Sequence, residues 1–588
     1  MRKVTRLSTA EVAERQGFEP WIRCRIPDFE SGAFDHSAIS PRPDYTAGSA
    51  RTSEFRRFRL VPGLVFRFVL LAAFAALLGG CASTPPGAGV PKIASTALQT
   101  PASTRVGSRT AALESAHPGL SAFRLLSRGL DSFVARAELA AAAEKTLDVQ
   151  YYIVQNDDTG QLLLETLLLA ADRGVRVRLL IDDTGTSGRQ EPLMTLAAHP
   201  QIELRVFNPF TTRGSMALRA VEFVFGAERL NYRMHNKLFI CDNAVAITGG
   251  RNIGDEYFSA SRRLEFGDYD LLIAGPATRT LSRSFDAYWN SDQAVPAEAL
   301  GFSKPSPQDL EAYRKSLAEH HQAMAGTDFV KGLQQGGPLR ELLANQRVTW
   351  AHSEVLYDSP DKASVEAGEV DGKLMRQRVE QAMKDVRSEL LMVSPYLVPG
   401  DDGLRLLRGL RERNVTLRIL TNSLASSDAP IVQAGYDRYR IPLLEIGAEL
   451  FEVRPVLGQP ESRGGSVAKS GGGQFALHAK VMIFDRQRVF VGSMNFDQRS
   501  LKINTEIGLL IDSRDMAETL ARRFADSSQP ANAFALSLTP PDASGHQALV
   551  WSTVENGQPV TYDSEPGASF LRRLQADAFA LFPIEDQL

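Results

Sequence analysis

Cysteine is scarce in this sequence of 588 residues, which contains only Cys24, Cys81 and Cys241. No two of them form a C-x-x-C pair, so the sequence argues against a disulfide framework and against a zinc site built from thiolates. Cys241 lies in an apolar run and is predicted to be a small buried hydrophobic side chain. Only Cys81, in the N-terminal region, lies in a sequence that indicates a chemical modification.

An excess of charge of either sign is also missing, because 66 Lys and Arg residues face 69 Asp and Glu residues, for a net charge of -3. Proteins that bind nucleic acid without sequence preference usually carry a strongly basic patch. The balance argues against such binding, although it leaves a locally basic cleft open. The 43% hydrophobic and 23% charged residues are typical of a soluble globular protein, and the length allows two to four domains.

The N-terminal region lacks an apolar run of membrane-spanning length. The run 68–78 has eleven residues, whereas a spanning helix needs about 20. A short apolar core behind a basic flank is typical of a secretory signal peptide, predicted here over 59–81. The flank contains Arg51, Arg56, Arg57, Arg59 and Arg67. Because a signal peptide should begin close to its basic flank, residues 1–58 are interpreted as an over-called start or a disordered stretch.

The signal peptide ends in Leu78-Gly79-Gly80-Cys81, which resembles the lipobox of bacterial lipoproteins. The resemblance implies that the chain is cut before Cys81, that this thiol is acylated, and that the protein faces the periplasm from a membrane of the bacterial cell envelope. An ordinary signal peptide or an interfacial anchor with an incidental cysteine is the alternative. Residues 82–118 are rich in Ser, Thr, Pro, Gly and Ala without a periodic apolar face, and are predicted to be a flexible linker.

The rest of the chain passes twice through one pattern of strand, helix and strand. The first copy comprises 147–154, 161–174 and 175–182, the second comprises 389–398, 403–414 and 415–422, and further strands follow at 202–207 and 448–453. This alternation predicts an α/β fold with two similar α-β-α lobes, each with a mostly parallel sheet covered by helices on both faces. We expect lobe 1 over 119–345, with a helical insertion or linker at 300–345, lobe 2 over 346–540, and a C-terminal extension over 541–588 that packs on the lobes.

The duplication is sharpest in a His-x-Lys-x4-Asp motif. It consists of His235, Lys237 and Asp242 in the first copy and of His478, Lys480 and Asp485 in the second, 243 residues later. Matched asparagines follow at Asn252 and Asn495, and matched strand starts at Asp268-x-Asp270 and Asn504-x-Glu506. One such motif is weak evidence, but two copies with matched downstream residues indicate one site assembled from both.

The spacing suits a strand, in which residues i and i+2 lie on one face, so the His and Lys of each motif are expected to project together. The aspartate is expected on the opposite face at the end of the strand, and is interpreted as structural although it belongs to the motif. The asparagine follows a turn of small residues, where the backbone can approach a ligand closely.

Two facing sets of imidazole, ammonium and amide provide what phosphodiester displacement needs. One imidazole attacks phosphorus and forms a covalent phosphohistidine, and the other protonates the leaving alcohol and then deprotonates the incoming one. The lysines and asparagines hold the non-bridging oxygens, so no metal or cofactor is expected. Asp270 and Glu506 are predicted to hold the imidazoles in the required tautomer. The two histidines are expected to carry opposite protonation states at the working pH.

These residues resemble the phospholipase D superfamily, whose signature is the duplicated motif, and 235–258 looks most like bacterial cardiolipin synthases of the C type. Similar stretches lie at 285–291, 478–500 and 565–574, and the resemblance covers about 120–588. It implies the phospholipase D fold, with one pseudo-twofold active site between the lobes. It also implies a phosphatidyltransferase that makes cardiolipin from phosphatidylglycerol and a second phospholipid, with phosphatidylethanolamine as the donor associated with this branch.

The resemblance carries residue roles as well. It makes His235 the nucleophile and His478 the acid and base. Ser493, Asn495 and Glu506 stand where the family has its Gly-Ser-x-Asn and its downstream acid, whereas the first copy has Gly250 in place of the serine. Other cardiolipin synthases are commonly held by membrane-spanning helices. A lipobox in their place leaves open which leaflet and lipid pool the enzyme reaches.

Three other interpretations use the same residues. The first is a phospholipase D that hydrolyses phospholipids to phosphatidic acid, and the second is a secreted phosphodiesterase acting on nucleic acid, against which the charge balance argues. The third is a non-catalytic lipid-binding lipoprotein, against which the complete motifs argue. The expected partners are phospholipids and a membrane surface, not nucleic acid. The glycine-rich stretch 458–474 is either a disordered loop or a lid over the lipid site.

Overall fold

The computed structural model describes residues 86–87, 89–185, 190–212, 216–301, 305–457 and 474–580. All of them belong to one compact unit, Thr84–Leu588. The predictions of an over-called start, a signal peptide and a lipidated Cys81, and most of the glycine-rich stretch, lie outside the described residues.

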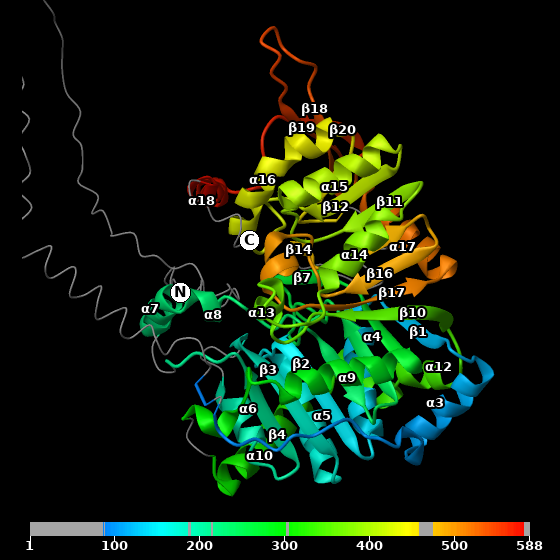
Figure 1. Ribbon diagram of the computed structural model, residues 1–588, viewed down its shortest axis with the longest axis vertical. Helices are drawn as coiled ribbons and strands as arrows, with labels where there is room; N and C mark the ends of the chain where they lie inside the picture. The colour runs from blue at the N-terminus through cyan, green and yellow to red at the C-terminus, as the bar shows by residue number, and fades with distance from the viewer. Residues whose placement is uncertain are drawn as a thin grey trace, which may run out of the picture. The chain divides into compact units, whose positions relative to one another are not determined.

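Two sheets with the same strand order form the framework of this unit (Figure 1). The first sheet has the order β9-β4-β3-β2-β5-β6-β8-β1, and the second has the order β18-β13-β12-β11-β15-β16-β17-β10. Strand β1 pairs antiparallel with β10 and joins the two sheets. The internal repeat seen in the sequence is therefore a repeat of topology.

The bounds of the strands follow the repeat. The first sheet contains β1 (Ser121–Leu126), β2 (Thr146–Ile153), β3 (Arg176–Gly185), β4 (Ile202–Phe207), β5 (Leu238–Cys241), β6 (Val245–Gly249), β8 (Asp270–Ala274) and β9 (Ala294–Pro296). The second contains β10 (Thr349–Tyr357), β11 (Glu389–Val393), β12 (Thr416–Asn422), β13 (Glu449–Val453), β15 (Val481–Phe484), β16 (Arg488–Gly492), β17 (Ile507–Asp512) and β18 (Ala533–Leu538), extended by β19 (Leu549–Glu555) and β20 (Gln558–Tyr562).

Each sheet is mixed, so the expectation of mostly parallel sheets was wrong. Only β2, β3 and β4, and their counterparts β11, β12 and β13, run parallel to one another. The motif strands β5 and β15 pair antiparallel on both sides. On the side of β6 and β16 the reason is the tight turn after each motif strand, with a positive φ of 51° at Asp242 and Asn243 in the first copy and of 52° and 53° at Asp485 and Arg486 in the second. A turn this short can connect only antiparallel strands.

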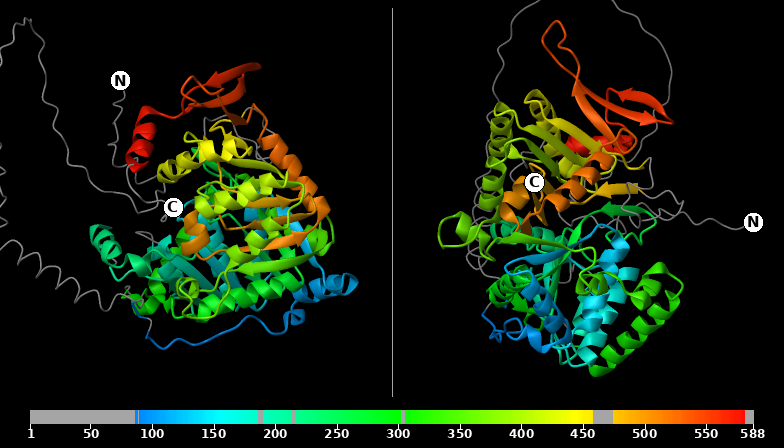
Figure 2. Two further views of the ribbon diagram at one scale, coloured as in Figure 1. Left: turned by 45° about the horizontal axis from the view of Figure 1, so that its top comes forward. Right: turned by 90° about the vertical axis from the view of Figure 1, so that its right-hand side faces the viewer.

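Helices cover the sheets (Figures 1 and 2), and three apolar cores hold them there. The outer cores lie between the first sheet and α4 and α5, and between the second sheet and α14, α15 and α16. The central core is shared by the inner faces of both sheets with α9 and α17. These helices are α4 (Gly129–Ala142), α5 (Asp158–Asp172), α9 (Pro276–Asn290), α14 (Met375–Lys384), α15 (Gly400–Glu412), α16 (Pro430–Glu445) and α17 (Arg514–Ser527). The predicted pair of α-β-α lobes is confirmed, and each sheet with its helices is called the first or second lobe below.

Helix α5 shows how the sequence determines these elements. The Asp157 side chain caps the helix by accepting the N–H of Gly160 at 2.9 Å. Leu164, Leu167 and Leu168 are spaced by three and four residues and bury one stripe of the helix against the sheet. Cys241 is fully buried in the same core, as predicted.

Residues 89–118, within the predicted flexible linker, are structured against the first lobe. The N–H of Ala97 donates to Asp286 Oδ2 at 2.9 Å. Helix α3 (Arg105–Ala116) follows, capped by the side chain of Thr104. The linker prediction was wrong for this part. Small and polar residues dock here through main-chain hydrogen bonds and caps, which leave no apolar periodicity in the sequence.

The stretch 300–345 and the C-terminal extension are also helical in part. Helices α10 (Pro307–Ala323), α11 (Asp328–Gln335) and α12 (Pro338–Leu343) pack on α4 and α5, and α18 (Phe570–Ala580) packs on α16. The domain boundaries stay predictions. Within the described ranges, no helix combines the length and the apolar character needed to cross a membrane.

Candidate active site

The His and Lys of each motif lie in extended segments that come just before β5 and β15, not within the strands as expected. The main chain of each segment is bound by the opposite lobe. The N–H of His235 donates to the carbonyl of Thr505, and the N–H of His478 donates to the carbonyl of Gly267, both at 2.9 Å. Because these donors are used across the interface, the segments cannot continue the ladder of their own sheet.

The two cross-lobe hydrogen bonds place an acidic side chain beside each imidazole. Glu506 follows Thr505, and its carboxylate oxygens lie 2.9 and 3.0 Å from Nδ1 of His235. Asp268 follows Gly267, and its Oδ2 lies 2.6 Å from Nδ1 of His478. The imidazoles are therefore each oriented by an acid from the other lobe, and neither copy of the motif is complete alone.

Asp270 does not hold an imidazole, so this part of the prediction was wrong. Its Oδ2 lies 3.0 Å from Nη2 of Arg136 and 3.6 Å from Nη1 of Arg251, and it also accepts a short hydrogen bond from the Ser132 hydroxyl. Although burial raises the pKa of Asp270, the two arginines lower it more, so its pKa lies below the usual range. The carboxylate is held in a structural ion cluster instead of facing the site.

The residue that replaces a serine in the first copy explains why Asp268 takes this place. A side-chain carbon on Gly250 would lie 2.3 Å from Asp268 Oδ1, so the glycine leaves the space that the carboxylate occupies. In the second copy, Ser493 donates a short hydrogen bond to Glu506 and accepts the N–H of Ile507 at 3.0 Å. Ser493 therefore supports the acid and does not face a phosphate oxygen in this structure.

The asparagines differ in a similar way. Asn252 Oδ1 accepts the N–H of Ile153 at 3.3 Å, and its Nδ2 donates to the Tyr257 hydroxyl at 3.0 Å. Asn495 is buried, and its Oδ1 has no hydrogen-bond partner among the described residues. Buried amides normally have such partners. Asn495 is therefore the asparagine with capacity for a further contact.

Each lysine is folded back onto the carbonyl of its own histidine. Lys237 Nζ donates to the His235 carbonyl at 2.6 Å, and Lys480 Nζ donates to the His478 carbonyl and lies 3.0 Å from His478 Nδ1. Burial lowers the pKa of Lys237 well below its usual value and that of Lys480 to about 8. Two ammonium groups in a dry site suit an anionic ligand, whose charge would restore both pKa values.

The histidines are nearly inaccessible, at 7% for His235 and 5% for His478. Burial lowers the pKa of His235 to about 4, against the opposing effect of Glu506. Burial, and then both lysines, lower the pKa of His478 well below its usual value. Since the charges of each motif act on the imidazole of the other, the two copies form one electrostatic site. The opposite protonation of the two histidines stays a prediction.

The two acids differ in charge state. Burial raises the pKa of Asp268 to about 7, although Lys480 and Arg251 oppose this. Burial alone would also raise the pKa of Glu506, but His235, Lys237 and Ser493 outweigh it, so this pKa lies below the usual value. At neutral pH, Glu506 is therefore ionised, whereas the Asp268 carboxyl is close to the midpoint of its titration.

The motif aspartates lie at the far ends of the motif strands, in the turns. Asp242 accepts the N–H groups of Glu144, Lys145 and Thr146 at 2.8 to 3.0 Å. Asp485 does the same for Arg387, Ser388 and Glu389, where β11 begins. Each aspartate thus ties the motif hairpin to the start of the neighbouring strand. The structural interpretation of the aspartates agrees with this geometry.

Aromatic rings close the site around the imidazoles, and the sequence analysis did not select them. The ring centroid of Tyr152 lies 5.1 Å from that of His235, and those of Tyr257 and Phe266 lie 5.2 and 5.1 Å from that of His478. They come from the end of β2 and from the region before Asp268. In the sequence, these aromatic residues stand out only because they lie near the repeated elements. Aromatic residues of the core lie there as well, so the sequence could not distinguish the two groups.

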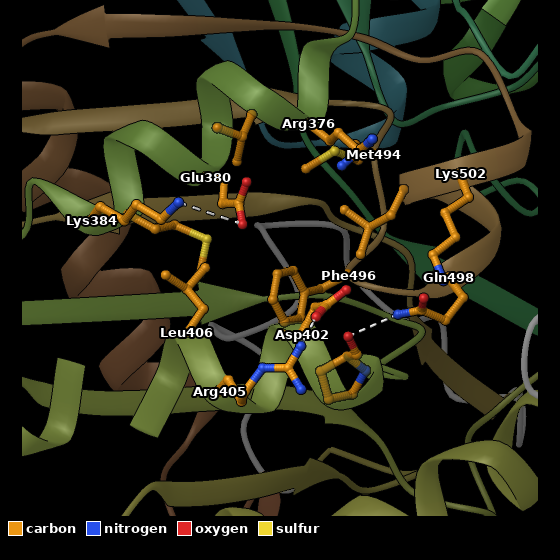
Figure 3. A pocket seen from close by; sticks show the side chains of 15 residues that line it. Arg376, Glu380, Lys384, Asp402, Arg405, Leu406, Met494, Phe496, Gln498 and Lys502 are labelled. Carbon is orange, nitrogen blue, oxygen red and sulfur yellow. Dashed lines mark hydrogen bonds and ion pairs between the residues drawn. The ribbon is translucent and has the colours of Figure 1, made fainter. Parts of the chain in front are cut away.

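A cavity of about 380 Å³ lies on the other side of the segment that carries Asn495 (Figure 3). Met494 and Phe496 line it, whereas Ser493 points toward Glu506, since side chains alternate along the extended segment. Its rim charges pair with one another, as in Lys384 with Glu380 at 3.7 Å. The cavity is thus separate from the histidine site.

Comparisons with known proteins give matches along most of this unit. Residues 137–289 and 379–527 each match the family described as cardiolipin synthase, phospholipase D-like domain. The chain is similar to cardiolipin synthase C of Escherichia coli (strain K12), at 36% identity over 484 residues, which cover 82% of this chain and 99% of the relative. It is also similar to cardiolipin synthase of Geobacillus sp. (strain WCH70), at 25% identity over 70% of this chain and 66% of the relative.

Among solved structures, a phosphatidylserine synthase from Haemophilus influenzae Rd KW20 aligns with 82% of this chain and 100% of its own, at 13% identity and a TM-score of 0.49.

Proposed function

Because this chain belongs to the family of cardiolipin synthases with phospholipase D-like domains, as the sequence predicted, we propose that it makes cardiolipin from phosphatidylglycerol and a second phospholipid. Membership makes it a phospholipase D-type, cardiolipin synthase-like phosphatidyltransferase. The observation that supports the proposed chemistry is the pair of buried imidazoles, each held at Nδ1 by an acid of the other lobe.

In the first half-reaction, His235 is the nucleophile. Its Nδ1–H donates to ionised Glu506, which leaves Nε2 to attack phosphorus, and the charge of Glu506 stabilises the imidazole as it becomes positive. A P–N bond forms, the P–O bond to the donor's headgroup alcohol breaks, and His478 gives that alcohol its proton. The pairing with Asp268, whose pKa is about 7, supplies a proton to this half of the site.

In the second half-reaction, the hydroxyl of phosphatidylglycerol attacks the phosphatidyl-histidine. His478 takes the hydroxyl proton, the new P–O bond forms and the P–N bond to His235 breaks, so both histidines return to their starting state. The lysines, and Nδ2 of Asn495 as an amide donor, bind the non-bridging oxygens and the charge that develops on them. Water in place of the hydroxyl would give phosphatidic acid, which is the alternative function.

We also propose that the enzyme is attached to a membrane of the cell envelope through an acylated Cys81 and faces the periplasm. Several acyl chains hold a lipoprotein firmly, whereas a single chain holds only marginally. A lipid anchor fits an enzyme whose substrates are phospholipids. Growth with a labelled fatty acid, followed by gel analysis of wild type and Cys81→Ser, tests this, and label on the variant would refute it.

The function is tested by a lipid profile. The full chain, His235→Ala and His478→Ala are expressed in a host without cardiolipin synthases. Cardiolipin with wild type and with neither variant is the expected result. Phosphatidic acid without cardiolipin would show a hydrolase, and no change in either lipid would contradict both functions.

A further inference from the structure

Among the side chains of helix α7 (Met216–Phe225) that the structure describes, Arg219 and Glu222 turn inward, whereas Leu218 and Val221 turn outward. Arg219 Nη2 lies 3.4 Å from Asp183 Oδ2, and the Arg219 side chain is only 12% exposed. Glu222, at 18% exposure, accepts the N–H groups of Thr211 and Thr212. Leu218 and Val221, in contrast, are 59% and 52% exposed. A surface helix in water normally has the opposite arrangement.

Helix α18 (Phe570–Ala580) also exposes large apolar side chains and turns one arginine inward. Phe570, Leu571 and Leu574 are 82%, 62% and 51% exposed. Arg572 turns inward, where Nη1 donates to the carbonyl of Ala425 at 2.9 Å and Nη2 donates to the carbonyl of Ser427. Single exposed leucines are ordinary, but groups of large exposed apolar side chains on two helices mark a surface that contacts a membrane or another protein.

Both helices are tied to the loops that position the two histidines. Arg219 contacts Asp183, and the neighbouring Asp182 accepts the N–H of Met234, the residue before His235, at 2.9 Å. In the second lobe, the loop bound by Arg572 begins after Asn422, whose Oδ1 accepts the N–H of Leu477 at 2.8 Å.

Leu477 is the residue before His478, as Met234 is the residue before His235. In each lobe, a loop that contacts an inward arginine therefore also binds the residue before the motif histidine. Figure 1 and the left view of Figure 2 both show α7 and α18 on the same side of the unit. The two helices therefore lie on one side of the unit, and each is linked to a loop that contacts a motif segment.

The rim of the second lobe between α18 and the site continues this surface. Gly567, just before α18, lies beside Pro455, whose carbonyl accepts the N–H of Phe475 in β14 (Gln474–Leu477). Val456 is 58% exposed. Strand β14 pairs with β7 (Leu264–Gly267), which Arg262 and Arg263 precede, both exposed. Exposed arginines beside apolar side chains suit the headgroups of an anionic bilayer.

We propose that the exposed faces of α7 and α18 form a bilayer-docking surface that dips into the membrane on both sides of the site. This rests on the proposed function, because a phospholipid substrate must pass from the bilayer to histidines that are almost fully buried. Docking through two apolar faces would bring the site mouth to the headgroup level, where a phosphodiester can enter while its acyl chains remain in lipid. The inward arginines would couple docking to the loops that hold Met234 and Leu477.

Site-specific photocrosslinking tests the surface itself. In the full chain, p-benzoyl-phenylalanine replaces Val221, Leu574 or Leu169 one at a time. Leu169 on α5 is the matched control, because it is 48% exposed but lies over the outer core of the first lobe. The proteins are mixed with vesicles of radiolabelled phosphatidylglycerol and phosphatidylethanolamine and irradiated. We expect labelled-lipid adducts at Val221 and Leu574 at about fivefold or more the yield at Leu169.

Equal yields at the three positions would overturn the proposal, and so would adducts between two protein copies in place of lipid adducts. Kinetics give an independent test with Phe570→Glu/Leu574→Glu and the control Leu169→Glu. We expect the double variant to lose about tenfold in turnover on vesicles, because two apolar anchors are lost, but to retain turnover on monomeric dihexanoyl phosphatidylglycerol. An equal loss on both substrates would contradict docking. If wild type lacks transferase activity, the proposed function fails, but the crosslinking result still decides the docking surface.

Discussion

The two halves of the site use the same main-chain arrangement and different acids. In one half, Glu506 contacts His235 and is supported by the Ser493 hydroxyl. In the other half, Gly250 has no side chain, and Asp268 enters the space and contacts His478. By position in the repeat, the counterpart of Glu506 is Asp270, which Arg136 holds elsewhere.

This difference teaches that a duplicated motif need not keep duplicated roles. The acid beside His235 has a lowered pKa and is a fixed negative charge, whereas the acid beside His478 has a pKa raised to about 7 and exchanges a proton near neutrality. A fixed negative charge, as on Glu506, favours a nucleophilic imidazole. A carboxyl that titrates near neutrality, as Asp268 does, favours an imidazole that acts as a general acid. The asymmetry in the acids therefore supports the same assignment of roles as the family resemblance.

The largest expected effect separates the two histidines. His235→Ala should lower transfer by a factor on the order of 10⁵ and abolish the phosphohistidine. His478→Ala should lower turnover similarly but still form the intermediate from a donor with a good leaving group, since His235 remains. Rapid quenching with ³²P-labelled donor and analysis of alkali-stable phosphoprotein measures this. Label on the His235→Ala protein alone would reverse the assignment.

A smaller effect is expected from the acids, and here the pH dependence distinguishes them. Glu506→Gln should lower turnover by about 10³-fold throughout the neutral range, because an amide cannot stabilise the positive imidazole. Wild-type turnover should fall as the pH rises through about 7, where the pair of Asp268 and His478 loses its proton.

Asp268→Asn should lose less activity at low pH than Glu506→Gln does, and it should move this alkaline limb to lower pH, because burial and both lysines hold the pKa of His478 well below its usual value. Profiles of turnover against pH for the three proteins, with folding verified by circular dichroism, provide the measurement. The comparison fails if Glu506→Gln, not Asp268→Asn, moves the alkaline limb.

Exchanging the small residues would test the origin of the asymmetry. Gly250→Ser forces a side-chain atom into the space of Asp268 and should lower turnover about 100-fold. Ser493→Gly removes one hydrogen bond to Glu506 and should cost about tenfold, since Ser500 still donates to Glu506 at 2.8 Å. Steady-state kinetics on the two variants measure the difference. A larger loss for Ser493→Gly would show that Asp268 tolerates displacement.

Much of the fold could be predicted because the repeat is visible in the sequence. The positions of β2, α5 and β4 follow from apolar runs and periodicity, and the two-lobe arrangement follows from duplication. The parallel expectation failed because strand direction depends on turns, and the positive φ of Asp242 and Asn243 is not a strong signal in the sequence. The docking of residues 89–118 depends on main-chain hydrogen bonds that any small residue could make.

Most residues of the site were predicted, but the contact between His478 and Asp268 was not. The sequence identifies both histidines and both lysines, and Glu506 contacts an imidazole as expected. Asp270 was chosen over Asp268 because it matches Glu506 in the repeat, and this choice was wrong. Which of the two contacts the imidazole depends on Arg136, which comes from helix α4, far away in the sequence. The absence of a side chain at Gly250 was the only local signal of the difference.

The smallest expected effect on activity concerns the motif aspartates, which differ in burial but not in their role in the turn. Asp242 is fully buried and accepts three main-chain N–H groups, so Asp242→Ala should lower the free energy of unfolding by about 3 kcal/mol, because the donors lose their partner without access to water. Asp485 is partly exposed, so water can replace the carboxylate and Asp485→Ala should cost about 1 kcal/mol.

Denaturant unfolding of the two variants and wild type measures the difference, and turnover of the folded fraction should change less than threefold if the aspartates act only through the turns. A large loss of turnover in a stably folded Asp485→Ala protein would show that the second hairpin transmits its position to His478, which would be a functional asymmetry beyond that of the acids.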